Sequence, residues 1–194
     1  PVFMETRGLP MNTEIEAMDH VRRIREGIIV QCEHGYYAGY HGGGIYDNEG
    51  QRIESIPGDG GATHMRNFIE AVRSRRATDL RAPIEPGHKS TSTCLLGNVS
   101  YRAGGPADLA TIRRELAGMP GVAERIDNIE QHLTTLGVDL AARPLTLGAW
   151  VHFNPETETI ESVDGPTAHD RSIEIARHEL RGTHREPFVI RDEV

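Results

Sequence analysis

Residues 27–53, GIIVQCEHGYYAGYHGGGIYDNEGQRI, decide the fold class of this chain. β-branched and aromatic residues gather over residues 27–32 and 36–40, between glycines, which predicts two strands. The turn-forming residues YDNEG, 46–50, then separate these strands from an alternating third strand over residues 51–56. The stretch therefore predicts an antiparallel β-meander.

The spacing of apolar residues changes to a helical period after this meander. Four apolar residues at i, i+3, i+4 and i+7 predict a helix over residues 62–75, namely Met65, Phe68, Ile69 and Val72. A second helix is predicted over residues 86–101, with Pro86 in its first turn and Gly104 as its stop. We expect these two helices to cover one face of the sheet, with Phe68 and Leu95 in the core.

The rest of the chain predicts further helices and a small hairpin. The expected elements are a strand over residues 2–7, helices over residues 14–26, 106–116, 120–136 and 166–180, and a hairpin of residues 150–153 and 159–163. The apolar stripe of residues 120–136 covers barely two heptads, which favours a core-facing helix over a coiled coil. The predicted fold class is α+β, a mainly antiparallel sheet with helices packed on one face and a helical C-terminal extension. No repeat or linker divides residues 1–194, which predicts a single domain.

Composition excludes several classes of function. The 37% hydrophobic and 26% charged residues are typical of a soluble globular protein. No apolar run approaches the length of a membrane span, and the first ten residues carry no secretory signal. The net charge of -8 disfavours nucleic acid and anionic lipid as partners. Cys32 and Cys94 are far apart and predict two buried free thiols, which fits a reducing, cytoplasmic setting.

Polar rings crowd the second strand and the glycines around it. They are His34, Tyr36, Tyr37, Tyr40 and His41. Alternation predicts Tyr36 and Tyr40 on one face with His34, and Tyr37 and His41 on the other. The rings are candidates for contact with a substrate, but a structural or interface role is favoured because no carboxylate pair or general base accompanies them.

Other chemistry-bearing residues give weaker signals. His88 lies beside Lys89 and Ser90 without a G-x-S-x-G elbow, so a packing or capping role is favoured over that of a base, while a substrate contact stays open. GDGG, residues 58–61, lacks the G-x-G-x-x-G spacing, so a turn capped by Asp59 or Thr63 is favoured over a phosphate site. The ten histidines include no H-E-x-x-H motif. We therefore assign no catalytic, cofactor-binding or metal-binding residue.

Three blocks carry a resemblance to a known family. They are residues 27–53, a helix pair that contains Asn67, Phe68, Arg73, His88, Ser90 and Asn98, and the tail from Leu145 onward. In this order they resemble the C-terminal domain of bacterial oxidoreductases of the glucose-fructose oxidoreductase, inositol dehydrogenase and MocA family, in the branch with an extended tail. The resemblance covers nearly the whole chain.

The resemblance implies a parent protein with an N-terminal Rossmann domain that binds NAD or NADP. It also implies a lysine in a Glu-Lys-Pro signature beside the nicotinamide, and an Asp and a His that help proton transfer. None of these motifs occurs in this chain, whose first residues resemble the middle of the family's second domain. We therefore expect a substrate-binding and oligomerisation domain of an NAD(P)-dependent sugar or polyol oxidoreductase, which is not catalytically competent alone. The alternative is a free-standing, non-enzymatic ligand-binding or assembly module.

The sheet itself predicts self-association. The strands over residues 27–40 carry apolar or aromatic side chains at consecutive positions, so both faces are rich in groups that favour burial. Two helices cover one face at most, and a second copy is the simplest cover for the other. We expect a dimer or tetramer through the open sheet face, with aggregation through an exposed edge as the alternative.

Overall fold

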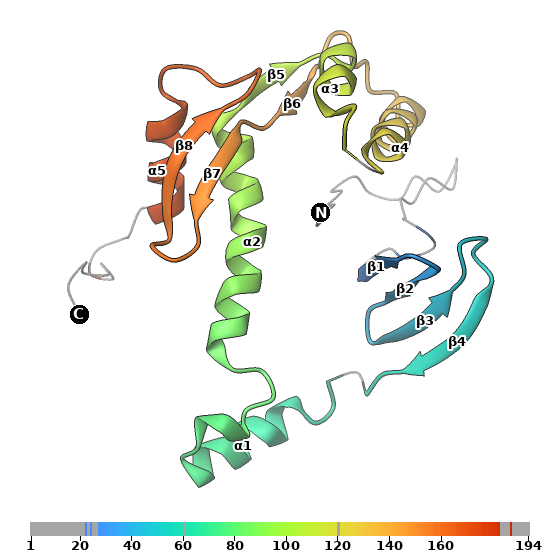
Figure 1. The fold of residues 1–194 in the computed structure, drawn as a ribbon, viewed down its shortest axis with the longest axis vertical. Coiled ribbons are helices and arrows are strands. Elements are labelled where there is room, and N and C mark those ends of the chain that lie inside the picture. Colours follow the sequence, from blue (N-terminus) through green and yellow to red (C-terminus); the bar gives the residue numbers. More distant parts are fainter. Residues whose placement is uncertain are drawn as a thin grey trace. The chain divides into compact units, whose positions relative to one another are not determined.

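The computed structural model describes residues 22, 24, 27–59, 61–119, 121–182 and 187. Within them the chain forms five α-helices, one four-stranded antiparallel sheet and two two-stranded sheets (Figure 1). This arrangement confirms the predicted α+β class. The strand predicted over residues 2–7 lies outside the described residues, as does the helix over residues 14–26 apart from Arg22 and Ile24.

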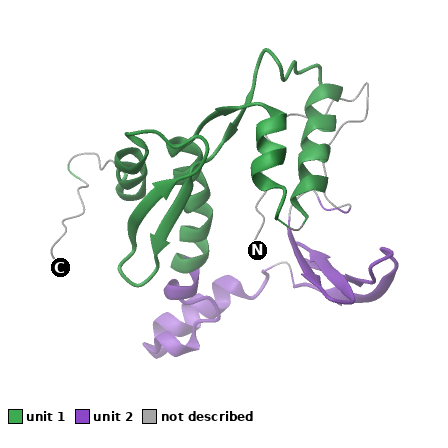
Figure 2. Ribbon diagram, turned by 45° about the horizontal axis from the view of Figure 1, so that its top comes forward, with its two compact units in different colours: residues 1–4, 88–194 green, residues 5–87 purple. Residues whose placement is uncertain are grey.

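The described residues divide into two compact units (Figure 2). In chain order, the first unit ends at Gly87, is purple in Figure 2 and holds the four-stranded sheet and a helix, and the second unit begins at His88 and is green. Each unit has its own secondary structure and is described by itself. That residues 1–194 form one domain stays a prediction.

The first unit contains a meander in which each strand pairs with the next. Its strands are β1 (Ile28–Cys32), β2 (Gly35–Gly39), β3 (Gly42–Tyr46) and β4 (Arg52–Pro57). The strand β3 was not predicted, because three of its five residues are glycine, a residue depleted in strands. Aromatic rings occupy the space above two of these glycines. A Cβ on Gly43 would lie 2.7 Å from Cε2 of Tyr37, and one on Gly44 would lie 2.9 Å from Cε2 of Tyr46.

A helix and a short 3-10 turn follow the meander, α1 (His64–Ser74) and η1 (Ala77–Asp79). The Asn67 side chain joins them, since its Nδ2 donates to the Asp79 carbonyl at 2.7 Å and its Oδ1 accepts from the Arg81 N–H at 2.9 Å. The apolar side of α1, the α1 stripe, consists of Met65, Phe68, Ile69 and Val72. All four side chains are exposed, Phe68 by 51%. The prediction that Phe68 is a core residue is therefore wrong for the described chain.

The core of the second unit lies between two helices and a hairpin. Its elements are α2 (Ile84–Ala103), β7 (Trp150–Asn154), β8 (Thr159–Asp164) and α5 (Ser172–Arg181). The buried residues are Val99, Ala103, Ala149, Ile160 and Ala176. The hydroxyl of Ser172, a residue 1% exposed, donates to the Ala103 carbonyl at 2.7 Å and fixes α5 against α2. The predicted C-terminal helix thus packs on α2, but Leu95 is 58% exposed and is not a core residue.

Helix α5 begins six residues later than predicted because hydrogen-bonded turns come first. The Ala168 N–H donates to the Gly165 carbonyl at 3.1 Å. The Ser172 hydroxyl oxygen accepts from the His169 N–H at 2.9 Å. These bonds hold the backbone before Ser172 in turns that precede the first helical residue.

A helical hairpin is inserted between two short paired strands. The strands are β5 (Gly105–Ala107) and β6 (Leu145–Leu147), and the helices are α3 (Leu109–Leu116) and α4 (Val122–Thr135). Thus Pro106 and Ala107, predicted as the start of a helix, lie in a strand. The insertion has its own small core of Ala107, Ile112, Val122 and Ile126. Arg113 of α3 ties the two helices together through Asp127 and Glu130 of α4.

We predict that this insertion can be removed without unfolding the hairpin core. Ala107 and Leu145 are register partners in adjacent antiparallel strands, so an Asn-Gly turn can replace residues 108–144. The near-ultraviolet circular dichroism of Trp150, the single tryptophan, should be unchanged because its strand belongs to the other core. Loss of that signal in the shortened chain would contradict the separation of the two cores.

Three carboxylates stabilise turns and helix ends, of which Asp59 and Asp108 are exposed and Asp79 is half-buried, and their pKa values lie below the ordinary 3.8. The Gly61 N–H lowers the pKa of Asp59, the Ser74 hydroxyl lowers that of Asp79, and the Thr111 N–H lowers that of Asp108. A depressed folded pKa contributes stability above the unfolded value, which is lost as pH falls through the folded value.

We therefore predict that stability to denaturant falls below about pH 4. A chain with Asp59→Asn, Asp79→Asn and Asp108→Asn should show a flatter decline, since asparagine keeps a hydrogen-bond acceptor but does not titrate. Unfolding midpoints measured in urea across the acid range test this. Parallel curves for the two proteins would show that these carboxylates do not set the acid dependence.

Candidate functional site

The predicted ring cluster does not form one site. Tyr36 and Tyr37 are consecutive in β2 and lie on opposite faces, as alternation predicts. Tyr40 and His41, however, lie in the turn between β2 and β3, with ring centroids 3.9 Å apart, and therefore do not continue the alternation. His34 lies in the turn before β2 with an exposed side chain. The rings thus occupy both ends and both faces of the strand.

Tyr36 lies on the more polar face of the sheet. Its ring stacks on the ring of Tyr46 with centroids 5.0 Å apart and an angle of 12° between the planes. The Arg22 guanidinium carbon lies 4.0 Å from the centre of the Tyr36 ring, and Nη1 of Arg22 donates to Oε1 of Gln31 at 2.7 Å. This face presents stacked phenols, a cation and an amide, groups that can hydrogen-bond a hydroxylated ligand.

Tyr37 has a structural role on the opposite face. Its hydroxyl donates to the Gly42 carbonyl at 3.2 Å, and its ring lies over Gly39 and Gly43. Together with aliphatic residues from three strands, this ring forms an apolar surface that we call the platform. Strand register places its members on this face: Ile28, Val30, Tyr37, Ile45 and Ile56.

His88 belongs to the second unit and lies in α2. Its Nε2 is 2.6 Å from Oε1 of Glu158, a residue in the turn between β7 and β8. The contact ties the beginning of α2 to the end of the hairpin. This contact agrees with the packing role that the sequence favours for His88, and a substrate contact of His88 stays a prediction.

Asp59 and Gly61 of the GDGG segment lie in the predicted turn, in which the Ala62 N–H donates to the Asp59 carbonyl at 3.0 Å, but Thr63, the N-cap of α1, makes no side-chain capping bond. Oδ1 of Asp59 accepts from the Gly61 N–H at 2.8 Å, and Oδ2 accepts from the Thr63 hydroxyl at 3.0 Å. Oγ1 of Thr63 accepts in turn from Nη1 of Arg81 at 2.9 Å. The carboxylate therefore occupies these donors, which a bound phosphate would need for itself.

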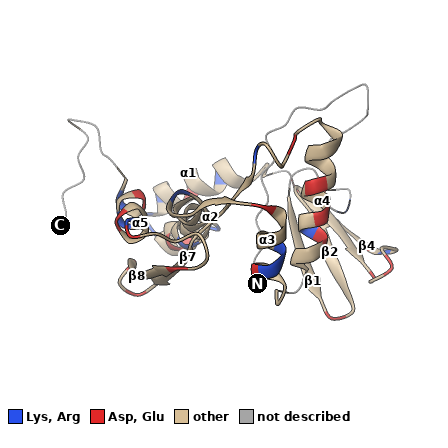
Figure 3. Cartoon of the chain, turned by 90° about the horizontal axis from the view of Figure 1, so that it is seen from above, with Lys and Arg blue, Asp and Glu red and all other residues tan. Residues whose placement is uncertain are grey.

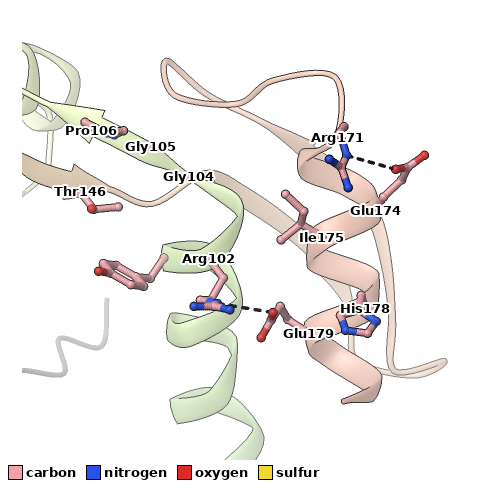
Figure 4. Close-up of a pocket in the computed structure, with 11 residues that line it drawn as sticks. Arg102, Gly104, Gly105, Pro106, Thr146, Arg171, Glu174, Ile175, His178 and Glu179 are labelled. Carbon is pink, nitrogen blue, oxygen red and sulfur yellow. Dashed lines mark hydrogen bonds and ion pairs between the residues drawn. The ribbon is translucent and has the colours of Figure 1, made fainter. Parts of the chain in front are cut away.

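A cavity of about 570 Å³ in the second unit was not predicted (Figure 4). The end of α2, strands β5 and β6, and α5 line it. Two ion pairs lie in its wall: Nε of Arg102 is 3.4 Å from Oε1 of Glu179, and Nε of Arg171 is 4.0 Å from Oε2 of Glu174. Because these charges neutralise each other in pairs, the lining favours neither an anion nor a cation.

The wall of this cavity is held by close backbone contacts. Gly104 follows α2 directly, and a Cβ there would collide with the Leu147 carbonyl and lie 2.7 Å from the Ala149 nitrogen. The residues of α5 that face the cavity recur at helical spacing, namely Arg171, Glu174, Ile175, His178 and Glu179. That spacing is the one sequence signal from which this wall could have been predicted.

The described residues assemble no recognisable reaction centre. No group of three or more His, Cys, Asp or Glu side chains among them is placed to hold a metal ion. Cys32 and Cys94 are free but exposed, so their predicted burial is wrong. The depressed pKa values described above belong to turns and helix starts and not to the cavity. No helix in the described part of the chain is long and apolar enough to span a membrane.

Comparisons with protein-family models, with curated proteins and with solved structures found no match to this chain.

Proposed function

We propose that this chain is the C-terminal substrate-side and oligomerisation domain of an NAD(P)-dependent oxidoreductase that acts on a sugar or polyol. The sequence resemblance supports the proposal, because its three blocks correspond in order to distinct structural elements. The first holds β1 to β3 and the beginning of β4, the second contains α1 and α2, and the third contains the hairpin β7–β8 and α5. Free thiols at Cys32 and Cys94 suit a cytoplasmic parent.

The platform is the observation that carries the assembly part of the proposal. Ile28 and Val30 are 64% and 49% exposed, although β-branched side chains of this size favour burial. Neither β1 nor β2 contains Asp, Glu, Lys or Arg, and Figure 3 draws the ribbons of both strands in the colour of uncharged residues. A contiguous apolar face of this kind is typical of an interaction surface. A second copy of the chain has an apolar surface that can cover it.

The opposite face supports the substrate part of the proposal. Tyr36, Tyr46 and Arg22 combine flat rings with hydrogen-bonding groups, and a sugar presents both C–H faces and hydroxyl groups. The nucleotide and the reacting groups would come from the Rossmann domain of the parent protein.

The platform equally favours a second candidate, a free-standing assembly module without chemistry. The reading frame upstream of Pro1 discriminates between the two. The oxidoreductase proposal predicts a contiguous segment that encodes a strand, a G-x-G-x-x-G turn and a helix, followed by a Glu-Lys-Pro signature. The longer product should reduce NAD or NADP in the presence of a sugar or polyol. A start codon directly before Pro1 would support the assembly module.

A further inference from the structure

Two apolar surfaces of the first unit are open at the same time, the α1 stripe and the platform, on which Ile28, Val30 and Ile56 are exposed while Tyr37 and Ile45 are half-buried. We infer that α1 of one copy covers the platform of a second copy, and that the second copy returns the same contact. This inference rests on the proposed self-association and names the element that forms the interface. The sequence predicts a dimer in which two sheet faces meet. In the inferred dimer, each copy instead places its helix α1 on the sheet of the other copy.

The shape of the platform suits a helix. Gly39 and Gly43 lie between Ile28 and Ile56 in the register, so the middle of this row has no side chain of its own. The Tyr37 ring lies over the two glycines and fills the gap. A flat apolar face with few projecting side chains offers little to interdigitate with another sheet, whereas the stripe of an amphipathic helix can lie across it.

The charges beside the two surfaces are complementary. Glu54 pairs with Ile45 in the register and is the acidic residue of the platform's strand positions. Arg66 and Arg73 lie on α1 beside the stripe, but Nε of Arg66 already pairs with Oε1 of Glu70 at 3.2 Å. Arg73 is therefore the cation that complements Glu54. Exposed pairs of this kind contribute little affinity, but they select the orientation of the helix on the sheet.

The connection from β4 to α1 explains why a second copy is the partner. Gly58 lies so close to the His41 carbonyl that a Cβ would not fit. Beyond it, the bonds of Asp59 with Gly61 and Thr63 hold the start of α1. The chain between these points is short, and both surfaces remain exposed within one copy. Two copies related by a twofold axis can cover both surfaces without breaking these contacts.

Disulfide trapping between two variants tests the inference. In a Cys32→Ser, Cys94→Ser background, one variant carries Val30→Cys on the platform and the other Ile69→Cys on the stripe. After mixing and mild oxidation, we expect the linked dimer that contains one copy of each variant to predominate. Phe68→Glu should raise the dimer dissociation constant by about tenfold or more. Leu95→Glu, at a comparably exposed leucine of the other unit, should leave it unchanged.

Three results would overturn the inference, with far-ultraviolet circular dichroism confirming that each variant is folded. An intrachain disulfide in a monomer that carries both cysteines would show that α1 covers its own sheet. Dissociation by Val30→Glu but not by Phe68→Glu would show that platforms face each other, which leaves the proposed self-association intact. A wild-type chain that stays monomeric would remove both the inference and the assembly role.

Discussion

Replacement of Ile160 by alanine should cost about 2–5 kcal/mol of the free energy of unfolding, the usual range for deleting a buried aliphatic side chain. Ile160 is 3% exposed and lies in the core formed by α2, β7, β8 and α5. Its carbonyl also accepts from Nε and Nη2 of Arg177 at 3.3 and 3.2 Å, which brings α5 onto β8. Since small domains are stable by only about 5–15 kcal/mol, this loss is a large fraction.

Leu95→Ala is the matched control, because Leu95 is an aliphatic residue of the same unit that is 58% exposed. We expect its effect to remain within about 0.5 kcal/mol, as for other surface substitutions. Urea unfolding followed by the fluorescence of Trp150 measures both variants. Equal losses of the free energy of unfolding for Ile160→Ala and Leu95→Ala would show that Ile160 is not part of the core.

Val30→Glu should convert a dimer or tetramer into monomers. Val30 lies on the platform in the edge strand β1 and is 49% exposed, and burying a carboxylate in an apolar interface without a partner is strongly unfavourable. Sedimentation equilibrium at tens of micromolar measures the effect. Ser55→Glu is the control, since Ser55 is exposed on the opposite face of the same sheet and should leave the assembly unchanged.

A strictly monomeric wild-type chain at these concentrations would refute self-association. If Ser55→Glu dissociated the assembly and Val30→Glu did not, the interface would lie on the face that carries Tyr36. Aggregates of no defined size would instead point to pairing through an exposed strand edge.

Strand β3 shows where reasoning from the sequence fails for this fold. Alternation and turn residues predict β1, β2 and β4 to within one residue at each end. Gly42, Gly43 and Gly44 have no strand preference of their own, and their conformation depends on the Tyr37 and Tyr46 rings that lie over Gly43 and Gly44. Such support from another strand cannot be read from local composition.

The apolar stripes of the helices show a second limit of prediction from the sequence. The spacing of Met65, Phe68, Ile69 and Val72 predicts α1 correctly, since periodicity depends only on the helix itself. Periodicity does not identify the surface that covers a stripe. Phe68 and Leu95 were therefore assigned to a core that the described residues do not form.

The candidate sites depend on contacts between distant segments. Tyr101, Thr146 and Glu174 line one cavity but lie far apart in the sequence, and no motif links them. Conversely, His34 and His41 are close in sequence but lie in turns at opposite ends of β2. Proximity in the sequence therefore suggested a closer grouping of the rings than the structure has, and it gave no sign of the cavity.

Titration of NAD and NADP into two proteins, this chain and the longer product of its reading frame, tests the proposed function most directly. The proposal predicts that the longer product binds one of the nucleotides at micromolar concentration through its Rossmann domain. This chain alone should bind neither nucleotide, because the Asp59 carboxylate occupies the donors of Gly61 and Thr63 before α1, and this segment lacks the βαβ context that pyrophosphate binding requires. Micromolar binding by this chain alone, or no binding by the longer product, would contradict the account.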